Sequence, residues 1–259
     1  GYDNYDLGAC TDHGVVATHA PQGPTESVAQ GTLGMLIACA HNFARYNRLI
    51  REQGFSGRFA NIGVELKGKT LGIIGMGRIG RAVREKIRPF DMDVLAHDPY
   101  VEESEAPLET SMVDPETVLE SSDFVTLHVP LTEETRGMLT EDSFRKMKDS
   151  AYLINTTRGG MYDDAVLARA IRNDRIAGAA IDVFQNEPDI EDNPLLDLED
   201  CLLTPHISGV TVDSLTRIGN ILAESVLAAH RGEYPDNILN PDVYDEAVPE
   251  AHLSPSYRP

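Results

Sequence analysis

The fold is decided by the stretch Thr70-Leu71-Gly72-Ile73-Ile74-Gly75-Met76-Gly77-Arg78-Ile79-Gly80. A short apolar run leads directly into the pattern G-x-G-x-x-G, and a helical pattern follows to about residue 89. Gly75 permits a tight turn, Gly77 lets the backbone approach a pyrophosphate, and Gly80 allows close packing of helix on strand. The helix that begins near Arg78 offers unpaired N–H groups and a positive dipole end to phosphates. These features predict a dinucleotide-binding turn; the alternative is a glycine-rich turn that binds no ligand.

A second expected strand begins at Asp93 and ends at Asp98, 18 positions after Gly80. A carboxylate at that distance accepts hydrogen bonds from the 2′-hydroxyl of a ribose and repels a 2′-phosphate. Pro99 and Tyr100 supply no arginine that would reverse this preference. The sequence therefore predicts NAD as the cofactor rather than NADP.

Composition narrows the class of protein further. The 259 residues are 41% hydrophobic and carry a formal net charge of −20, and no apolar run approaches the length of a membrane span. An acidic field of this strength repels nucleic acid and anionic membranes, so we expect neither as a partner. One interpretation of the charge is adaptation to concentrated salt, in which carboxylate repulsion is screened. The other is an ordinary acidic protein.

The three cysteines, Cys10, Cys39 and Cys201, are scattered along the chain. They form neither a metal-ligand spacing nor a disulfide framework, so we expect no metal site. This cysteine usage, and the lack of a charged-then-apolar leader at the start of the sequence, predict a cytoplasmic location.

Continuous apolar runs alternate with amphipathic helical patterns after the glycine-rich turn. This alternation indicates an α/β fold: a doubly wound parallel sheet covered on both faces, with a partial second, smaller domain. The dinucleotide-binding domain is expected over 25–207, the partial domain over 1–24 and 208–244, and a flexible tail over 245–259. The expected strands are 14–18, 70–75, 93–98, 123–128, 151–155, 176–182 and 201–204, and the expected helices are 25–53, 78–89, 114–121, 141–147, 163–173 and 211–231.

Three further segments hold chemically useful side chains just after expected strands, where parallel sheets place their ligands. Arg158 stands before two glycines, Asp182 and Glu187 follow one strand, and His206 follows another. Taken singly, these residues are typical of a surface arginine, helix caps or loop charges, and a structural histidine. Together they supply a cation, an acid and an imidazole beside the predicted nicotinamide pocket. Reduction of an α-oxo acid requires such a set, because the anion must be anchored and the carbonyl oxygen must receive a proton.

Several motifs in one order resemble the D-isomer-specific 2-hydroxyacid dehydrogenase family, which includes phosphoglycerate, glycerate, glyoxylate and hydroxypyruvate reductases. Residues 1–6 are similar to the family's G-x-D-N-I-D, and residues 27–30 to S-V-A-E, with Gln30 departing from the usual acid. The other matching segments are 75–80, 155–160, 182–188 and 204–209.

The resemblance implies a role for each candidate residue. Arg158 would bind the carboxylate and carbonyl oxygen of the substrate, His206 would be the general acid in reduction, and Glu187 would hold the tautomer of His206 by a hydrogen bond. Asp182 would face the nicotinamide amide. The cofactor-binding set implied is Gly75, Gly77, Arg78, Ile79, Gly80, Asp98, His128, Val129, Pro130, Thr135, Asn155, Thr156, Thr157, Asp182, His206 and Gly209.

The resemblance also implies a small 2-hydroxy or 2-oxo acid substrate and a homodimer, formed through the helix near 25–53 and the arm near 47–60. The family has several dozen residues ahead of the motif at 1–6, so a fragment that binds NAD without turnover stays open. So does an NAD-sensing module like the corepressors that share this scaffold. Formate or phosphite oxidation is disfavoured, because formate enzymes of the group carry glutamine where Pro205 stands. The sequence does not name the particular acid.

Overall fold

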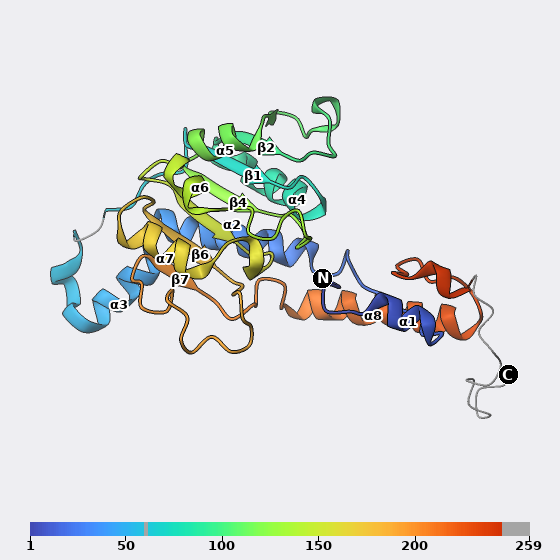
Figure 1. Cartoon of the computed structure of the whole chain (residues 1–259). Helices are drawn as coiled ribbons and strands as arrows, with labels where there is room; N and C mark the ends of the chain where they lie inside the picture. The colour runs from blue at the N-terminus through green and yellow to red at the C-terminus, as the bar shows by residue number, and fades with distance from the viewer. Residues whose placement is uncertain (60–61, 245–259) are drawn as a thin grey trace. The chain divides into compact units, whose positions relative to one another are not determined.

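A parallel sheet of seven strands, in the order β3-β2-β1-β4-β5-β6-β7, forms the centre of the larger of two compact units (Figure 1). This order, with β1 between the two halves, is that of a doubly wound nucleotide-binding fold. The expected α/β class is therefore confirmed. The strands are β1 (Thr70–Ile74), β2 (Asp93–His97), β3 (Ser111–Met112), β4 (Phe124–Leu127), β5 (Tyr152–Asn155), β6 (Gly178–Ile181) and β7 (Cys201–Leu203).

The computed structural model describes residues 1–59 and 62–244, so the tail expected over 245–259 lies outside the described residues. The chain divides into two compact units. The larger unit is Thr25–Thr211 and contains the whole sheet. The smaller unit combines residues 1–24 with those from 212 onward.

Helices cover both faces of the sheet, which explains why its strands are continuously apolar. On one face, α2 and α4 bury Leu36 and Val83 against Leu71 and Ile73 of β1. On the other face, α5, α6 and α7 form a second core, to which the next residue of β1, Ile74, points. The helices of the larger unit are α2 (Thr25–Ala40), α3 (Phe43–Gln53), α4 (Arg78–Ile87), α5 (Pro115–Ser121), α6 (Glu141–Lys146) and α7 (Asp164–Arg172), with short 3-10 turns η1 (Gly54–Gly57), η2 (Arg88–Phe90), η3 (Glu103–Glu105) and η4 (Gly159–Met161).

The single helix expected over 25–53 is wrong, because the structure breaks it into α2 and α3. Asn42, which precedes α3, adopts a left-handed conformation with φ of 54°. Asparagine tolerates that conformation better than most residues, and it ends a helix. The apolar spacing continues across the break, so periodicity alone did not reveal it.

The strand expected over residues 14–18 is also wrong, because these residues of the smaller unit form no strand of a sheet. They run alongside residues 237–240, with one isolated antiparallel bridge between Thr18 and Ile238. The buried Asn240 ties the two segments together: its Oδ1 accepts from the N–H of Ala17 and its Nδ2 donates to the carbonyl of Val15. The helices of this unit are α1 (Leu7–Asp12), α8 (Val212–His230) and the 3-10 turn η5 (Pro241–Tyr244).

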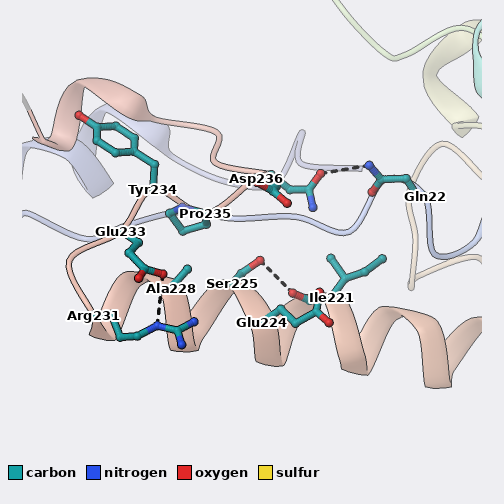
Figure 2. Close-up of a pocket in the computed structure, with 11 residues that line it drawn as sticks. Gln22, Ile221, Glu224, Ser225, Ala228, Arg231, Glu233, Tyr234, Pro235 and Asp236 are labelled. Atoms are coloured by element: carbon teal, nitrogen blue, oxygen red, sulfur yellow. Dashed lines mark hydrogen bonds and ion pairs between the residues drawn. The ribbon is translucent and has the colours of Figure 1, made fainter.

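A cavity of about 520 Å³ lies in the smaller unit between α8 and the segment that follows it (Figure 2). Arg231 and Glu233 form an ion pair at its rim, and Gln22 donates a hydrogen bond to Asn237. None of the candidate catalytic side chains lines this cavity.

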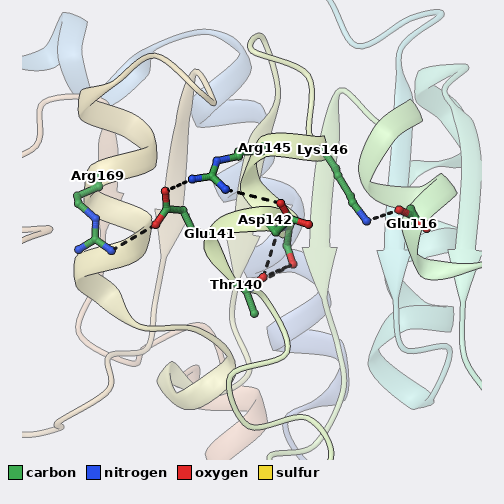
Figure 3. A network of polar contacts seen from close by, with 8 residues as sticks. Glu116, Thr140, Glu141, Asp142, Arg145, Lys146 and Arg169 are labelled. Atoms are coloured by element: carbon green, nitrogen blue, oxygen red, sulfur yellow. Dashed lines mark hydrogen bonds and ion pairs between the residues drawn. The ribbon is translucent and has the colours of Figure 1, made fainter.

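Ion pairs on the surface of the larger unit link neighbouring helices (Figure 3). Glu141 of α6 pairs with Arg145 of the same helix and with Arg169 of α7, and Lys146 pairs with Glu116 of α5. Exposed pairs of this kind contribute at most about 1 kcal/mol each. Within residues 1–59 and 62–244, no helix combines the length and apolar character that crossing a bilayer would require.

Candidate active site

The register of the sheet brings the three chemically useful segments to one edge. Asn155, the last residue of β5, is paired with Ile181 of β6, and Ile181 is paired with Leu203 of β7. Because these strands are parallel and adjacent, the residues that follow them emerge side by side. Arg158, Asp182 and His206 therefore belong to three neighbouring loops at the carboxyl edge of the sheet.

Asp182 holds the loop that carries His206. Its side chain is 1% exposed, and its carboxylate accepts hydrogen bonds from the hydroxyl of Thr204 (2.5 Å) and the N–H groups of Ile207 (2.8 Å) and Ser208 (2.9 Å). Its backbone carbonyl accepts from the N–H of His206 at 2.8 Å. The resemblance placed Asp182 against the nicotinamide amide. In the structure its carboxylate accepts hydrogen bonds from three donors of the protein and so shapes this loop, and its contact with the nicotinamide amide stays a prediction.

His206 needs that support, because its φ of 54° lies in the left-handed region. A non-glycine residue there costs of the order of 1 kcal/mol and persists only where its surroundings enforce it. Strained backbone of this kind gathers at functional sites. The side chain of His206 is 46% exposed, so the strain presents an imidazole to the solvent rather than to the core.

Glu187 fixes the orientation of that imidazole. Its Oε2 lies 2.7 Å from Nδ1 of His206, and its Oε1 accepts a hydrogen bond from the N–H of Phe184 at 2.7 Å. An ionised carboxylate accepts hydrogen bonds but has no proton to donate. The imidazole must therefore be the donor, and Nδ1 carries the proton of the neutral ring. The other ring nitrogen, Nε2, is then the one that can exchange a proton with a bound molecule.

Arg158 follows β5 in a turn that Asn155 organises. The amide of Asn155 donates to the carbonyl of Arg158 (2.9 Å) and to the hydroxyl of Tyr162 (3.1 Å), and its oxygen accepts from the N–H and hydroxyl of Thr157. Asn155 is fully buried and Thr156 nearly so, with a hydroxyl contact to Thr32. Both were expected to line a cofactor cleft. In the structure Asn155 organises the turn that presents the half-buried Arg158, and the lining of a cofactor cleft by Asn155 and Thr156 stays a prediction.

The glycine-rich turn fits a dinucleotide. Gly75 has φ of 100°, and a Cβ on Gly80 would lie 2.0 Å from the carbonyl oxygen of Gly75, so larger residues are excluded at both positions. By contrast, a Cβ on Gly77 would meet no atom within 4 Å, which leaves this peptide open to a ligand. The helix α4 begins directly after Gly77 with no side-chain cap, so its first N–H groups face outward as an anion site requires. Arg78 and Ile79 open this helix.

Asp98 is attached to the same turn. Its Oδ2 accepts a hydrogen bond from the N–H of Met76 at 2.8 Å, while the carbonyl of Met76 accepts from Nε of Arg81 at 3.0 Å. Asp98 is partly exposed, and each carboxylate oxygen can accept a further hydrogen bond. The acid expected to receive a ribose therefore also holds the peptide between two of the glycines. Sequence reasoning missed this link and the role of Arg81.

The remaining cofactor candidates lie after β4 and after β7. The Nε2 of His128 contacts the hydroxyl of Thr126 at 3.0 Å, and its Nδ1 is buried without a partner. Burial lowers the pKa of His128 from 6.5 to about 3. Thr135 donates to the carbonyl of Pro130 at 2.6 Å and so closes the turn that begins at Val129. Gly209 is partly exposed beside the loop of His206.

Together, the doubly wound sheet, the open glycine-rich turn and the imidazole–carboxylate pair define the class of an NAD-binding oxidoreductase domain. Comparison with known proteins agrees with this class. Residues 33–208 match the model of the D-isomer specific 2-hydroxyacid dehydrogenase, NAD binding domain. The chain therefore belongs to the D-isomer specific 2-hydroxyacid dehydrogenase family.

Individual relatives cover nearly all of the chain. It is 39% identical over 241 residues to the D-3-phosphoglycerate dehydrogenase of Archaeoglobus fulgidus, covering 93% of this chain and 46% of the relative. It is 40% identical over 247 residues to the glyoxylate reductase of Korarchaeum cryptofilum, covering 94% of this chain and 74% of the relative. A solved structure of D-lactate dehydrogenase from Aquifex aeolicus, complexed with NAD and lactic acid, superimposes with a TM-score of 0.84 at 31% identity, covering 92% of this chain and 77% of that one. The chain thus spans about half of one relative and about three quarters of the others.

The two glycines of the turn give a matched pair of variants. We expect Gly77→Ala to leave the free energy of unfolding unchanged without cofactor, because its Cβ enters open space, and to weaken NADH binding at least about tenfold. Gly80→Ala should lower the free energy of unfolding by about 1–3 kcal/mol, because its Cβ overlaps the carbonyl of Gly75. Urea unfolding and NADH fluorescence titration measure the two effects. Parental NADH affinity in Gly77→Ala would refute this placement of the pyrophosphate.

His128 makes stability depend on pH. Its pKa is lower in the folded chain (about 3) than the ordinary 6.5, so between these values only the unfolded state binds the proton. His128 therefore lowers the free energy of unfolding by up to about 1.4 kcal/mol for each unit that pH falls through this window. We expect His128→Gln to lose that slope, whereas His13→Gln, at an exposed site of the smaller unit, keeps it. Equal slopes for the parent and His128→Gln in urea unfolding from pH 6.5 to 4 would contradict the burial of a neutral ring.

Proposed function

We propose that this chain catalyses NAD-dependent interconversion of a small D-2-hydroxy acid and its 2-oxo acid, working mainly as an oxo-acid reductase. One observation carries the proposal: Nδ1 of His206 lies 2.7 Å from Oε2 of Glu187 at the sheet edge to which the loop of Arg158 also belongs. An imidazole oriented by a carboxylate is the arrangement of a general acid and base. The match to an NAD-binding domain supports this proposal, because such a domain would place a nicotinamide cofactor near the imidazole and the carboxylate.

The cofactor would lie across the glycine-rich turn. The open peptide of Gly77 and the uncapped start of α4 would hold the pyrophosphate, and the spare acceptor capacity of Asp98 would hold the adenosine ribose. His128, Val129, Pro130 and Thr135 would border the adenosine side, and Gly209 the side toward His206. When bound, NADH supplies the hydride for the carbonyl carbon of the oxo acid.

Side chains of this chain would bind the substrate carboxylate and transfer the proton to the carbonyl oxygen. The planar guanidinium of Arg158 would bind the substrate carboxylate and polarise the carbonyl oxygen. In reduction, protonated His206 would give the proton on Nε2 to that oxygen while Glu187 keeps the ring oriented through Nδ1. In the oxidative direction, neutral His206 would take the proton back on the same nitrogen.

Turnover distinguishes this function from an NAD-sensing module on the same scaffold. A sensor requires the nucleotide-binding turn, but its function does not require a strained, half-exposed histidine that is hydrogen-bonded to a carboxylate. This pair of features favours catalysis. A screen of NADH oxidation over glyoxylate, hydroxypyruvate and pyruvate separates the two functions and also ranks the acids.

The assignment of roles predicts distinct kinetics for two variants. We expect His206→Asn to lower kcat by at least about 100-fold with little change in NADH affinity, because asparagine accepts the left-handed backbone but cannot transfer the proton. Arg158→Lys should in addition raise KM for the oxo acid, because a point charge cannot form the bidentate contact. Steady-state kinetics and NADH titration read these effects. Near-parental turnover by His206→Asn would remove the acid–base assignment.

We further propose a homodimer formed through α3 and the arm that follows it. The described part of this segment exposes an unusual number of large apolar side chains, and exposed apolar patches of this kind mark protein interfaces. They are Phe43, Ile50, Phe55, Phe59, Ile62 and Val64. A cytoplasmic location is proposed as well, supported by three cysteines that are all free.

Introduction of negative charge on the arm tests the dimer. We expect the double variant Phe55→Glu and Phe59→Glu to sediment as a monomer at concentrations where the parent is a dimer, because two carboxylates would be buried at the interface. Leu108→Glu, at an equally exposed position on another loop, is the control and should stay dimeric. A monomeric parent, or a dimeric double variant, would argue against this interface.

A further inference from the structure

A second buried carboxylate, Asp164, lies beneath the loop that carries Glu187. Asp164 opens α7 and is 3% exposed. Its Oδ2 accepts hydrogen bonds from the N–H of Gln185 at 3.2 Å and from Nδ2 of Asn193 at 2.6 Å. These donors stand at the two ends of the segment 185–193, and Glu187 lies between them. One carboxylate therefore ties both ends of the segment to α7.

The start of the segment is also fixed from the opposite direction. A Cβ on Gly159 would lie 2.0 Å from the carbonyl carbon of Phe184, so the turn after Arg158 is packed directly against this peptide. The N–H of Phe184 in turn donates to Oε1 of Glu187 at 2.7 Å. Phe184 and Gln185 are thus held between Gly159 and Asp164, and the carboxylate of Glu187 is oriented from there toward His206.

The burial of the Asp164 carboxyl group has a free-energy cost that packing alone does not explain. Its second oxygen, Oδ1, is buried and has no hydrogen-bond partner. Burial raises the pKa of Asp164 above its ordinary value, and the hydrogen bonds from Asn193 and Gln185 only partly oppose this. A buried, incompletely satisfied carboxyl group costs free energy that an apolar side chain would not. A group retained in spite of such a cost is a candidate for a role in the site.

We propose that Asp164 is a positioning residue for the acid–base pair. Through Gln185 and Asn193 it holds the segment 185–193 in the arrangement that lets Glu187 reach His206. The kinetic consequence rests on the proposed function, since it requires that the pair be catalytic. The structural part, the hold on the segment, does not.

Kinetics of single and double variants test the first part. Asp164→Ala should lower kcat by about 10- to 100-fold, the scale expected when a catalytic group is displaced by about 1 Å, without changing NADH affinity. Asp164→Asn should retain most of the turnover, because its amide oxygen can accept both hydrogen bonds. In a Glu187→Gln background, Asp164→Ala should add little, because the residue through which it acts is already lost. Losses that simply multiply would refute action through Glu187.

The neighbouring Asp163 supplies the control. It caps the same helix by accepting from the N–H of Ala165 at 2.7 Å, but within the described part of the chain no hydrogen bond joins it to the segment 185–193. Asp163→Ala should therefore destabilise α7 and leave kcat near that of the parent. A loss of turnover in Asp163→Ala equal to that in Asp164→Ala would mean that general loosening of α7, rather than the anchor, is responsible.

Hydrogen exchange on the full chain tests the second part without any turnover. In Asp164→Ala, peptides covering 184–193 should exchange faster, whereas those covering 201–208, which Asp182 holds, should not change. Should Asp164→Ala fail to fold, Asn193→Ala removes one of the two anchors and should show the same local effect. Unchanged exchange over 184–193 in the folded variant would overturn the proposal. A parent that reduces no oxo acid would refute the proposed function alone, because the exchange result would still decide whether Asp164 anchors the segment.

Discussion

The geometry of the site depends on one buried carboxylate, that of Asp182. It follows β6 directly, and it binds the loop that follows the neighbouring strand β7 through three hydrogen bonds from side chain and backbone donors. These bonds hold His206 in its left-handed conformation together with the hydrogen bond from its own N–H to the carbonyl of Asp182 and the contact of its ring with Glu187. The parallel register of β6 and β7 brings the acid to the loop, so the side chain of Asp182 connects the sheet with the strained histidine.

Three acids support His206, and their roles differ with their exposure to solvent. Asp182 and Asp164 are almost fully buried and bind backbone N–H groups, each under a different loop. Glu187 is 33% exposed and contacts the imidazole itself. Buried carboxylates bound to backbone donors fix geometry, whereas a carboxylate that must respond to the charge of an imidazole needs access to solvent. The site therefore has buried, hydrogen-bonded supports under a partly exposed pair of groups.

The sequence predicted the sheet well, because buried parallel strands are continuous apolar runs and the glycine-rich turn marks the first of them. It missed β3, whose two residues, Ser111 and Met112, are too few for any pattern. It also ran one helix through Asn42, because apolar periodicity does not register a single left-handed residue.

Prediction of the site was limited in another way. The sequence and the family resemblance indicated which residues gather at the sheet edge, but not which of their atoms are already in use. Asp182 and Asn155 are predicted to meet the cofactor, and the structure adds that their side chains also hold the loop after β7 and the turn after β5. Asp164 was passed over, because an acid at the start of a helix is ordinarily a solvated charge near the helix dipole. Its partners, Gln185 and Asn193, lie about 20 and 30 positions away in sequence, so only the folded chain reveals the link.

The most direct test of this arrangement is the tautomer of His206, read from its two ring ¹⁵N resonances in the chain without substrate. The hydrogen bond to Glu187 predicts that the neutral ring carries its proton on Nδ1 and leaves Nε2 unprotonated toward the substrate side. In Glu187→Gln this preference should weaken. A neutral ring protonated on Nε2 in the parent would contradict the account, because that nitrogen could then not act as the base in oxidation.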